Sequence, residues 1–506
     1  MKRLITLFVL NVLIITAGLA QPRQKDLSGL ISVKGELNKS YQNIPSGTPL
    51  TILRVVERTN TSEDNGIYYA VSINGMQETI PARKVDIITF ATPENDLEFW
   101  QQIYLKNHLY ESFAKRNSRH NLRKEIDEEC LAYLDQLEEI AYEDDYIVSY
   151  VQGVFAKLVT VNIDPNREEH INIRVIQSPD PDAYMLPNGT MLISTGLLCT
   201  LDSEDELAAV MATEIGHFVF DHQVENVYIS ERRAKRAAIW GTALAITADA
   251  AFDIGFWNDD NTAIGLGAAA SIGSIASLLS INTIDRLGMQ YKVKQEFMSD
   301  CIAKELLTFK GYNSNGLGSA LNKINNFYVQ QKHTDRIARY GSTDNIQKRL
   351  EKVGDYKELN SRLYLRKTAD VVTYNASIYL AGQRYEDAAL LVQKNIDNKF
   401  ASDYDYVILV KSEMALRNTK EANEQCLQLL DIAQELAGNN PNLDINKQRI
   451  LLLMRMNKQV KAVEELHKYM DLLTRYQEQG IEDEDIEWTD REMSWANQLL
   501  RKINRI

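Results

Sequence analysis

The sequence has only four cysteines in 506 residues, and no two of them form a CxxC pair. They lie far apart in the chain, at Cys130, Cys199, Cys301 and Cys426. This scarcity argues against a zinc knuckle and against a fold that is held together by many disulfides. The chain could still form one or two disulfides in an oxidising compartment.

The first twenty residues, MKRLITLFVLNVLIITAGLA, have the pattern of a secretory signal peptide. Lys2 and Arg3 precede an apolar run that is short for a bilayer span, and the small residues Gly18 and Ala20 predict cleavage after Ala20. No cysteine follows that point, so a lipid anchor is not expected there. We predict an exported protein, periplasmic or in the cell envelope, with an uncleaved anchor as the alternative.

Positive charge is also scarce, because 56 Lys and Arg residues stand against 70 Asp and Glu residues. Loss of Lys2 and Arg3 with the signal peptide leaves 54 against 70, a net charge of −16. Such a surface repels nucleic acid, so no nucleic-acid partner is expected.

The composition, 44% hydrophobic and 25% charged, is that of a globular protein with two or three domains. Residues 27–92 contain short apolar runs such as TPLTILRVVE and IYYAVSI, which are separated by polar turns that include Asn-Gly. This pattern predicts a small β-barrel or sandwich of about five strands. Its layout resembles a bacterial SH3-like module.

Residues 94–365 predict a mainly helical domain of α+β class. Apolar residues recur at helical spacing in DLEFWQQIYLKNHLYESF and IDEECLAYLDQLEEIAY, which indicates two or three helices. Residues 171–198 then alternate apolar and polar side chains around Pro-Asp and Asn-Gly turns, which predicts two or three strands. Ser203 and Glu206 have the spacing of a capping box, so the next helix begins there.

A long apolar region covers residues 237–284. Its second half, 262–284, has 23 residues without a charge and is long enough to span a bilayer. Its many Gly, Ala and Ser residues favour a closely packed helical hairpin, inside the protein or at a membrane surface, over a true span.

Residues 368–506 are helical in pattern and weakly self-similar, as in RYEDAALLV, NTKEANEQCL and KQVKAVEELH. Ala388 and Ala422 are 34 positions apart, and Ala462 follows 40 positions later. A period of 34 is that of tetratricopeptide repeats, in which a small residue lets paired helices pack closely. The tail is therefore predicted to be TPR-like and to bind protein, with an ordinary helical bundle as the alternative.

The stretch ELAAVMATEIGHFVFDH, residues 206–222, carries the candidate chemistry. On a wheel of about 100° per residue, apolar side chains cover nearly all faces, so this helix must be buried. Glu214 and His217 are then ionisable groups in a dry interior, where each needs a partner or a metal.

A zinc peptidase helix reads HExxH at such a place. Two histidines four apart reach one zinc ion, and the glutamate takes a proton from the metal-bound water. Here Thr213 stands where the first histidine would be. His222 lies about 140° around a continuous helix from His217 and cannot share the ion, so it is expected to be a capping or core histidine. Asp221 could form a shifted HxxxD site, which would leave Glu214 a turn away from the bound water. The other histidines have no motif around them: His108, His120, His170, His333 and His467.

Three segments together resemble the zincin-type metallopeptidase family that includes HtpX, BepA and the CaaX prenyl proteases. They are MLPNGTMLISTGLL at 185–198, ELAAVMATEIGH at 206–217, and EFMSD at 296–300, followed by Gly311 and Tyr312. The resemblance covers residues 94–353, about half of the chain, and the tail makes the whole similar to BepA. It implies a zincin-like fold for 94–365 and one zinc ion.

The resemblance also implies roles for particular residues. Glu214 matches the general base, His217 and Glu296 match zinc ligands, and Asp300 matches the carboxylate that orients a ligand histidine. The edge strand on which an extended substrate would lie matches Met191, Leu192, Ile193, Ser194 and Thr195.

Two departures from the family pattern bear on catalysis. Thr213 replaces a ligand, and GSTDNIQKRL at 341–350 stands where relatives read Ser-Thr-His-Pro before a basic residue. A zinc site worth roughly 10 to 16 kcal/mol over four ligands loses on the order of 3 kcal/mol with one imidazole, about a hundredfold in affinity.

Three functions are compatible with these residues. The first is an exported zinc metalloendopeptidase that cleaves extended or misfolded envelope proteins, with catalysis weakened by Thr213. The second is a non-catalytic pseudopeptidase that binds such proteins through its groove and its TPR-like repeats. The third is a helical scaffold in which Glu214 and His217 are a buried hydrogen-bonded pair. Weakened or lost catalysis is favoured on coordination chemistry.

Overall fold

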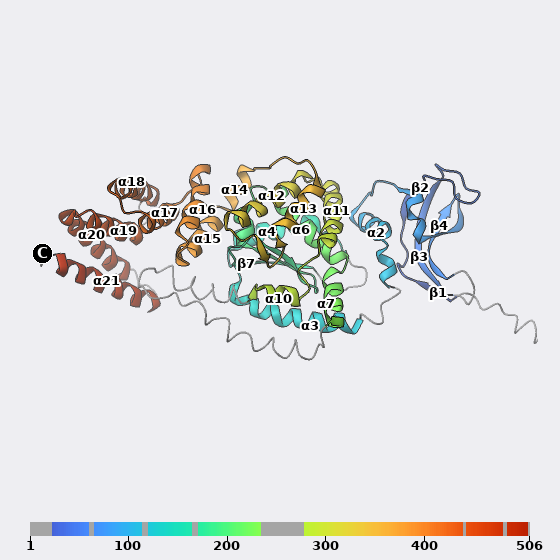
Figure 1. Ribbon diagram of the computed structural model, residues 1–506, viewed down its shortest axis with the longest axis horizontal. Coiled ribbons are helices and arrows are strands. Elements are labelled where there is room, and N and C mark those ends of the chain that lie inside the picture. The colour runs from blue at the N-terminus through green and yellow to red at the C-terminus, as the bar shows by residue number, and fades with distance from the viewer. Residues whose placement is uncertain are drawn as a thin grey trace, which may run out of the picture. The chain divides into compact units, whose positions relative to one another are not determined.

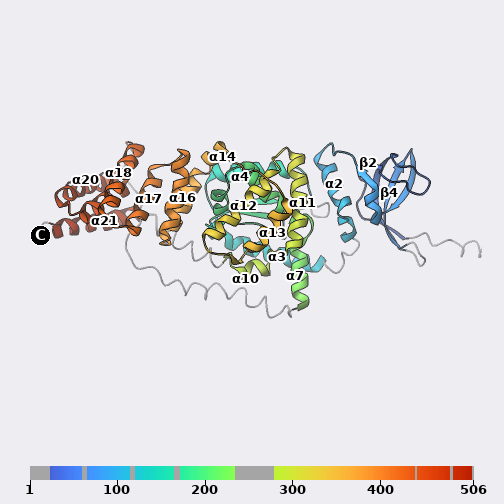
Figure 2. The same cartoon turned by 45° about the horizontal axis from the view of Figure 1, so that its top comes forward.

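The computed structural model describes residues 23–59, 65–113, 120–163, 171–233, 278–438, 442–478 and 483–503. The chain splits into two compact units, residues 1–125 with 159–170 and residues 126–158 with 171–506. Figure 1 and Figure 2 give two views of the described elements. The predicted signal peptide at 1–20 lies outside the described residues. The fold is mainly helical with small sheets, as the predicted α+β class requires.

The first unit contains an antiparallel sheet in which the described strands run in the order β5-β4-β3-β2-β6, and β1 pairs with the far end of β3. The first half of the long strand β3, residues 49–53, alternates buried and accessible residues, so one face of the sheet forms a core. The predicted strands in this region are confirmed. Their bounds are β1 (Arg23–Asp26), β2 (Val33–Leu37), β3 (Pro49–Thr59), β4 (Gly66–Ile73), β5 (Met76–Pro81) and β6 (Ile88–Phe90), with a short 3-10 helix η1 (Ala82–Ile87) before β6.

Helix α2 (Asp96–Lys106) belongs to the same unit. The side chain of Asn95 accepts a hydrogen bond from the Glu98 amide and so caps the first turn. Tyr69 on β4 donates its hydroxyl to Leu105 O over 3.0 Å, which fastens the helix to the sheet. A 3-10 turn η2 (Leu109–Phe113) follows, and then helix α3 (His120–Leu137) with the 3-10 turn η4 (Glu138–Ile140).

The second unit is built around a three-stranded sheet, β7 (Asn172–Ile176), β8 (Ala183–Met185) and β9 (Thr190–Ser194). The order is β7-β9-β8, with β7 parallel and β8 antiparallel to β9. The prediction that Met191, Leu192, Ile193, Ser194 and Thr195 form an edge strand is therefore wrong. The first four lie in the central strand, whose backbone is paired on both sides, and Thr195 begins the next helix. The sheet edge near the candidate site is β8.

Helices enclose this sheet in both views (Figure 1, Figure 2). Helix α6 begins as predicted, because Ser203 and Glu206 form a capping box, and every residue from Glu206 to Val219 is buried. Helices α3 and α10 lie side by side in both views, and Tyr133 on α3 donates to the carbonyl of Leu278, just before α10, over 2.9 Å. The elements are α4 (Asp145–Leu158), α5 (Thr195–Thr200), α6 (Glu204–Val219), α7 (His222–Arg233), α10 (Ile281–Arg286), α11 (Val293–Lys310), α12 (Asn315–Gln330), β10 (Asp335–Ile337), β11 (Gly341–Ser342) and α13 (Thr343–Val353).

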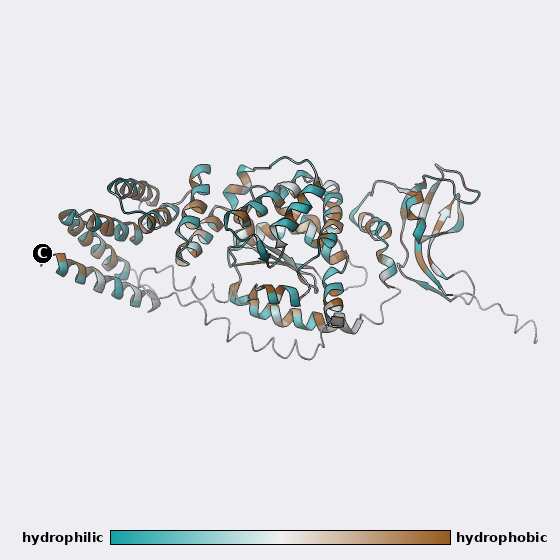
Figure 3. Cartoon of the chain, in the orientation of Figure 1, coloured by the Kyte–Doolittle hydropathy of each residue, from teal (hydrophilic) through white to brown (hydrophobic). Residues whose placement is uncertain are grey.

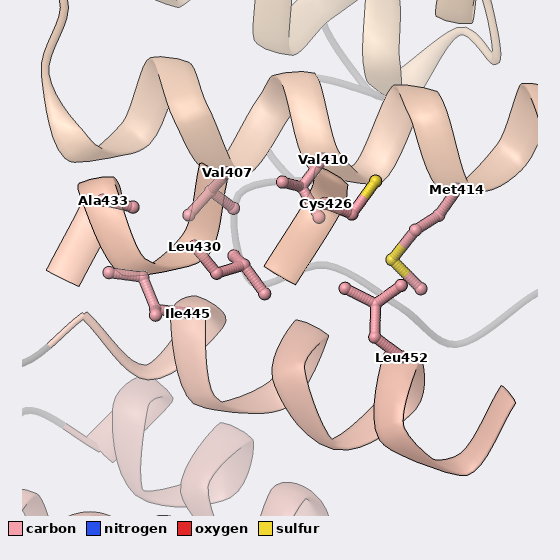
Figure 4. Packing of buried hydrophobic residues seen from close by; sticks show 8 residues of the cluster. All are labelled: Val407, Val410, Met414, Cys426, Leu430, Ala433, Ile445 and Leu452. Atoms are coloured by element: carbon pink, nitrogen blue, oxygen red, sulfur yellow. The ribbon is translucent and has the colours of Figure 1, made fainter. Parts of the chain in front are cut away.

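The C-terminal part is helical as predicted, and Figure 3 shows apolar and polar segments alternating along its helices. Side chains from α17, α18 and α19 form one buried cluster, which Figure 4 shows around Val410, Leu430 and Leu452. The helices are α14 (Arg362–Lys367), α15 (Ala369–Ala381), α16 (Tyr385–Asn398), α17 (Asp403–Leu416), α18 (Lys420–Ala437), α19 (Leu443–Arg455), α20 (Gln459–Glu478) and α21 (Asp483–Ile503).

Two further sequence expectations concern the apolar region 237–284 and the disulfides. Most of the apolar region 237–284 lies outside them, and its last residues begin α10, with Leu278, Leu279 and Ile284 buried. In the portion that the structure describes, no helix is both long enough and apolar enough to cross a membrane. All four cysteines are free, so the disulfides that the sequence left open are not formed.

Candidate functional site

Helix α6 and helix α11 cross at the candidate site. Gly216 makes this crossing close, because a Cβ at that position would lie 2.9 Å from the Ser299 Cα. The crossing brings His217 on α6 against Glu296 on α11, with His217 Nε2 3.1 Å from Glu296 Oε2. Both side chains are buried. The two predicted zinc ligands, which lie 79 positions apart in the chain, therefore share one site.

Arg339 lies at the centre of this site, and the sequence patterns did not indicate it. Its Nε is 3.0 Å from Glu214 Oε1, Nη2 bonds the same oxygen, and Nη1 is 2.6 Å from Glu296 Oε1. Its guanidinium also lies over the Tyr291 and Tyr340 rings, 4.6 and 5.1 Å from their centroids. Arg339 is 1% exposed. One buried cation thus bridges the predicted base and the predicted third ligand.

A second arginine completes the cluster. Arg349 on α13 donates to both oxygens of Asp300, over 3.0 and 2.7 Å, and its Nη1 lies 3.0 Å from Glu296 Oε2. The Thr213 hydroxyl is 3.3 Å from Asp300 Oδ1 and 3.2 Å from Ala209 O, and it can donate its one proton to either. Asp300 therefore faces the side chain at position 213, which is a threonine and not a ligand histidine.

His217 is held on its other side by His222. The two Nδ1 atoms lie 3.0 Å apart, and Tyr291 stacks on His217 with ring centroids 3.5 Å apart. His222 reaches this position because α6 ends at Val219 and Asp221 has a φ of 63°, so the continuous helix that the wheel assumed is broken. Burial lowers the pKa of His222 to about 4 and that of His217 well below its usual value, so both rings are neutral.

The neutral state fixes the protons of the histidine pair. Glu296 can only accept, so the His217 Nε2 must carry its hydrogen toward the carboxylate, and His222 Nδ1 then donates to His217 Nδ1. In this state the Nε2 of His217 is a hydrogen-bond donor to Glu296.

Charge within the cluster is balanced mainly by the two arginines. Burial alone would raise the pKa of Glu296, but the adjacent guanidinium groups of Arg339 and Arg349 hold it well below its usual value. Burial raises the pKa of Glu214 and of Asp300. Arg339 keeps its charge despite burial, because Glu214 and Glu296 raise its pKa.

Arg339, Glu214 and Gln223 also bond to the outer edge of β8. Asp182 O and Leu186 N bond to β9, so the intervening Ala183 and Met185 direct backbone groups away from it. Ala183 O accepts from Arg339 Nε over 3.2 Å, and Met185 N donates to Glu214 Oε2 over 3.2 Å. Met185 O accepts from the Gln223 side chain over 2.9 Å. Three outward groups of this edge are therefore already bonded.

Residues 149–356 match Peptidase family M48. This M48-like segment contains every residue of the cluster. In addition, 77 residues are 36% identical to the mitochondrial metalloendopeptidase OMA1 of Bos taurus, 80 residues are 36% identical to the mitochondrial metalloendopeptidase OMA1 of Schizosaccharomyces pombe, and 77 residues are 35% identical to that of Homo sapiens. Each match covers 15% of this chain, and the chain spans 15%, 23% and 15% of the respective relatives.

Peptidases of family M48 depend on zinc, and the cluster does not fit a zinc ion. The guanidinium of Arg339 fills the space between Glu214 and Glu296. Thr213 offers only a neutral hydroxyl. Among the described residues, no group of three His, Cys, Asp or Glu side chains is arranged to hold a metal ion.

Sequence reasoning missed Arg339 and Arg349, whereas His222 is a buried histidine, as expected. Arg349 had a signal, since it is the basic residue that follows the altered Ser-Thr-His-Pro position. Arg339 had a weaker one, an arginine in RIARYG directly before that segment. His222 could have been assigned to a second helix only if the turn at Asp221 had been foreseen.

Proposed function

We propose that this chain is an exported, non-catalytic relative of the M48 peptidases that binds envelope proteins without cleaving them. The observation that carries the proposal is the Arg339 guanidinium between Glu214 and Glu296. A peptidase of this type needs a metal-bound water beside the glutamate, and here the glutamate is engaged by a buried cation. Thr213 removes a metal ligand at the same site.

The helical tail supports a role in protein binding. Successive helices from α15 to α21 pack each on the next, and α15 also contacts α17, as α17 contacts α19. Such nearest-neighbour stacking is typical of solenoid repeats, which present extended binding surfaces. We propose that this tail is a TPR-like module and that the sheet of residues 27–92 is an SH3-like one. Extended or misfolded envelope proteins are the proposed partners.

The test uses residues 21–506, purified without added metal and again after incubation with zinc. Zinc per chain is measured by atomic absorption, and fluorescein-labelled casein serves as an unfolded protein, followed by anisotropy for binding and by gel electrophoresis for cleavage. We expect binding of casein, no cleavage, and far less than one zinc per chain.

The control is Glu214→Gln, with circular dichroism to establish that the variant is folded. One zinc per chain together with cleavage that disappears in folded Glu214→Gln would overturn the proposal in favour of an active peptidase. Absence of both cleavage and casein binding would overturn the binding role.

A further inference from the structure

Arg339 is held in place by its own segment of the chain. It lies between β10 and β11, which pair antiparallel, and the flanking residue Tyr340 is buried. The Tyr340 carbonyl accepts from the Asn345 side chain over 3.1 Å, and the Ala338 carbonyl accepts from Gln290 over 3.2 Å. The backbone on both sides of Arg339 is therefore anchored to other elements, and the guanidinium is preorganised in the site.

The electrostatics of the site favour keeping this cation. Glu214, Glu296 and Asp300 are all buried, and buried carboxylates require a partner. Arg339 and Arg349 supply two positive charges to these three groups through direct hydrogen bonds. A divalent cation entering beside Arg339 would compete for the oxygens of Glu214 and Glu296 that already accept from it, and would meet its positive charge.

The small cavity beside Thr213 also argues against a metal site. The cavity next to Thr213 is lined by Glu214, Arg339 and Arg349 among others and has a volume of about 10 Å³, enough for about one water molecule. An imidazole side chain at position 213 is larger than that of threonine and needs more room than this cavity offers. The Arg339 side chain is one of the groups that fill the space around this cavity, so its removal would enlarge the cavity.

We propose that Arg339 is an internal substitute for the divalent cation and that it, more than the loss of a histidine at Thr213, excludes metal from this site. This inference rests on the proposed function, because it explains why the natural chain lacks zinc. It predicts that Thr213→His alone does not create a metal site, whereas Thr213→His combined with Arg339→Ala does.

The experiment compares four variants of residues 21–506, each refolded in the presence of zinc and then desalted. They are Thr213→His, Thr213→His with Arg339→Ala, Thr213→His with Arg339→Lys, and Thr213→His with Arg417→Ala. Arg417 is an exposed arginine paired with Glu413, so its removal controls for loss of an arginine elsewhere. Zinc per chain and the zinc dissociation constant are measured by atomic absorption and by competition with a chromogenic chelator.

We expect about one zinc per chain only in Thr213→His with Arg339→Ala, with a dissociation constant at least about a hundredfold lower than in Thr213→His. The lysine variant keeps a cation and should stay free of zinc, as should the Arg417 control. Stoichiometric zinc in Thr213→His alone would overturn the inference and leave the proposed function intact. Stoichiometric zinc in the natural chain would instead overturn the proposed function.

The variant that combines Thr213→His with Arg339→Ala can fail to fold. A second measurement therefore uses Thr213→His alone, which retains Arg339. The urea midpoint of Thr213→His is recorded with and without excess zinc, since any ligand that binds the folded state raises stability. No change in the midpoint supports exclusion by Arg339. A zinc-dependent rise overturns it.

Discussion

The backbone N–H of Met185 donates to Glu214 Oε2 over 3.2 Å, while Oε1 of the same carboxylate accepts from Arg339. Glu214 therefore joins the outer edge of β8 to the arginine at the centre of the cluster, and both of its oxygens are engaged. In this arrangement the glutamate is a structural acceptor. An extended peptide could pair with β8 only by displacing the side chains that now bond to its edge.

Replacing Glu214 with glutamine is expected to lower the free energy of unfolding by about 3 kcal/mol, because a buried ion pair loses one partner. An amide has one acceptor atom, so its NH2 group must face either the Met185 N–H or the Arg339 guanidinium. Urea unfolding measures the loss. The control is Glu435→Gln, an exposed change on α18 that should alter stability by less than about 0.5 kcal/mol. Equal stability of the two variants would contradict the structural role.

Asp182 predicts a pH dependence of stability. It is buried and accepts from the Tyr184 and Tyr328 hydroxyls over 2.8 and 2.9 Å, and burial, followed by repulsion from Asp180, raises its pKa to about 7. As the pH rises, the unfolded chain loses the Asp182 proton near pH 3.8, whereas the folded state keeps it up to about pH 7. Stability from this group is present at low pH and is lost as the pH rises from about 4 to about 7.

The measurement is the difference in unfolding free energy between the natural chain and Asp182→Asn at pH 5 and at pH 8. The asparagine variant should gain on the natural chain by on the order of 1 kcal/mol or more as the pH rises, because asparagine has no proton to lose. Subtraction removes the contributions of groups whose pKa does not depend on the charge of Asp182. A difference that is independent of pH would rule out titration of Asp182 in this range.

Gly216 and Gly153 form a matched pair of helical glycines. In an open helical position Gly→Ala stabilises by up to about 1 kcal/mol. Gly153 on α4 is exposed with nothing within 4 Å of an added Cβ, so Gly153→Ala should raise stability. At Gly216 the added Cβ would meet backbone and side-chain atoms of Ser299 at 2.9 to 3.0 Å, so Gly216→Ala should lower it by about 1 to 3 kcal/mol. Thermal unfolding of both variants checks this, and changes of the same sign would refute the close crossing of α6 and α11.

The elements that were predicted correctly depend on neighbours in the sequence. The start of α6 follows from the hydroxyl of Ser203 and the carboxylate of Glu206, which satisfy backbone amides within one turn. Burial of the whole helix follows from its apolar faces. The strands in residues 171–198 follow from alternation.

The elements that were missed depend on distant partners. Arg339 meets Glu214 across 125 positions, and no local pattern distinguishes an arginine that enters a core from one on the surface. Alternation identifies β9 as a strand, but its central place depends on β7 pairing with it in parallel. The contact of His222 with His217 was not predicted, because a helical wheel does not represent the turn at Asp221.

The small residues that suggested repeats offer a test of the tail. Ala388 on α16 is fully buried in a cluster with Tyr379 of α15 and Ile408 of α17, so there is no room for a larger side chain. Ala388→Leu should therefore lower the free energy of unfolding by about 1 to 3 kcal/mol through overpacking. Ala415→Leu places the same side chain at an exposed position near the end of α17 and should change stability by less than about 0.5 kcal/mol. Urea unfolding followed by circular dichroism compares the two, and a tolerated Ala388→Leu would show that the helices do not pack as closely at that point as a TPR-like pair requires.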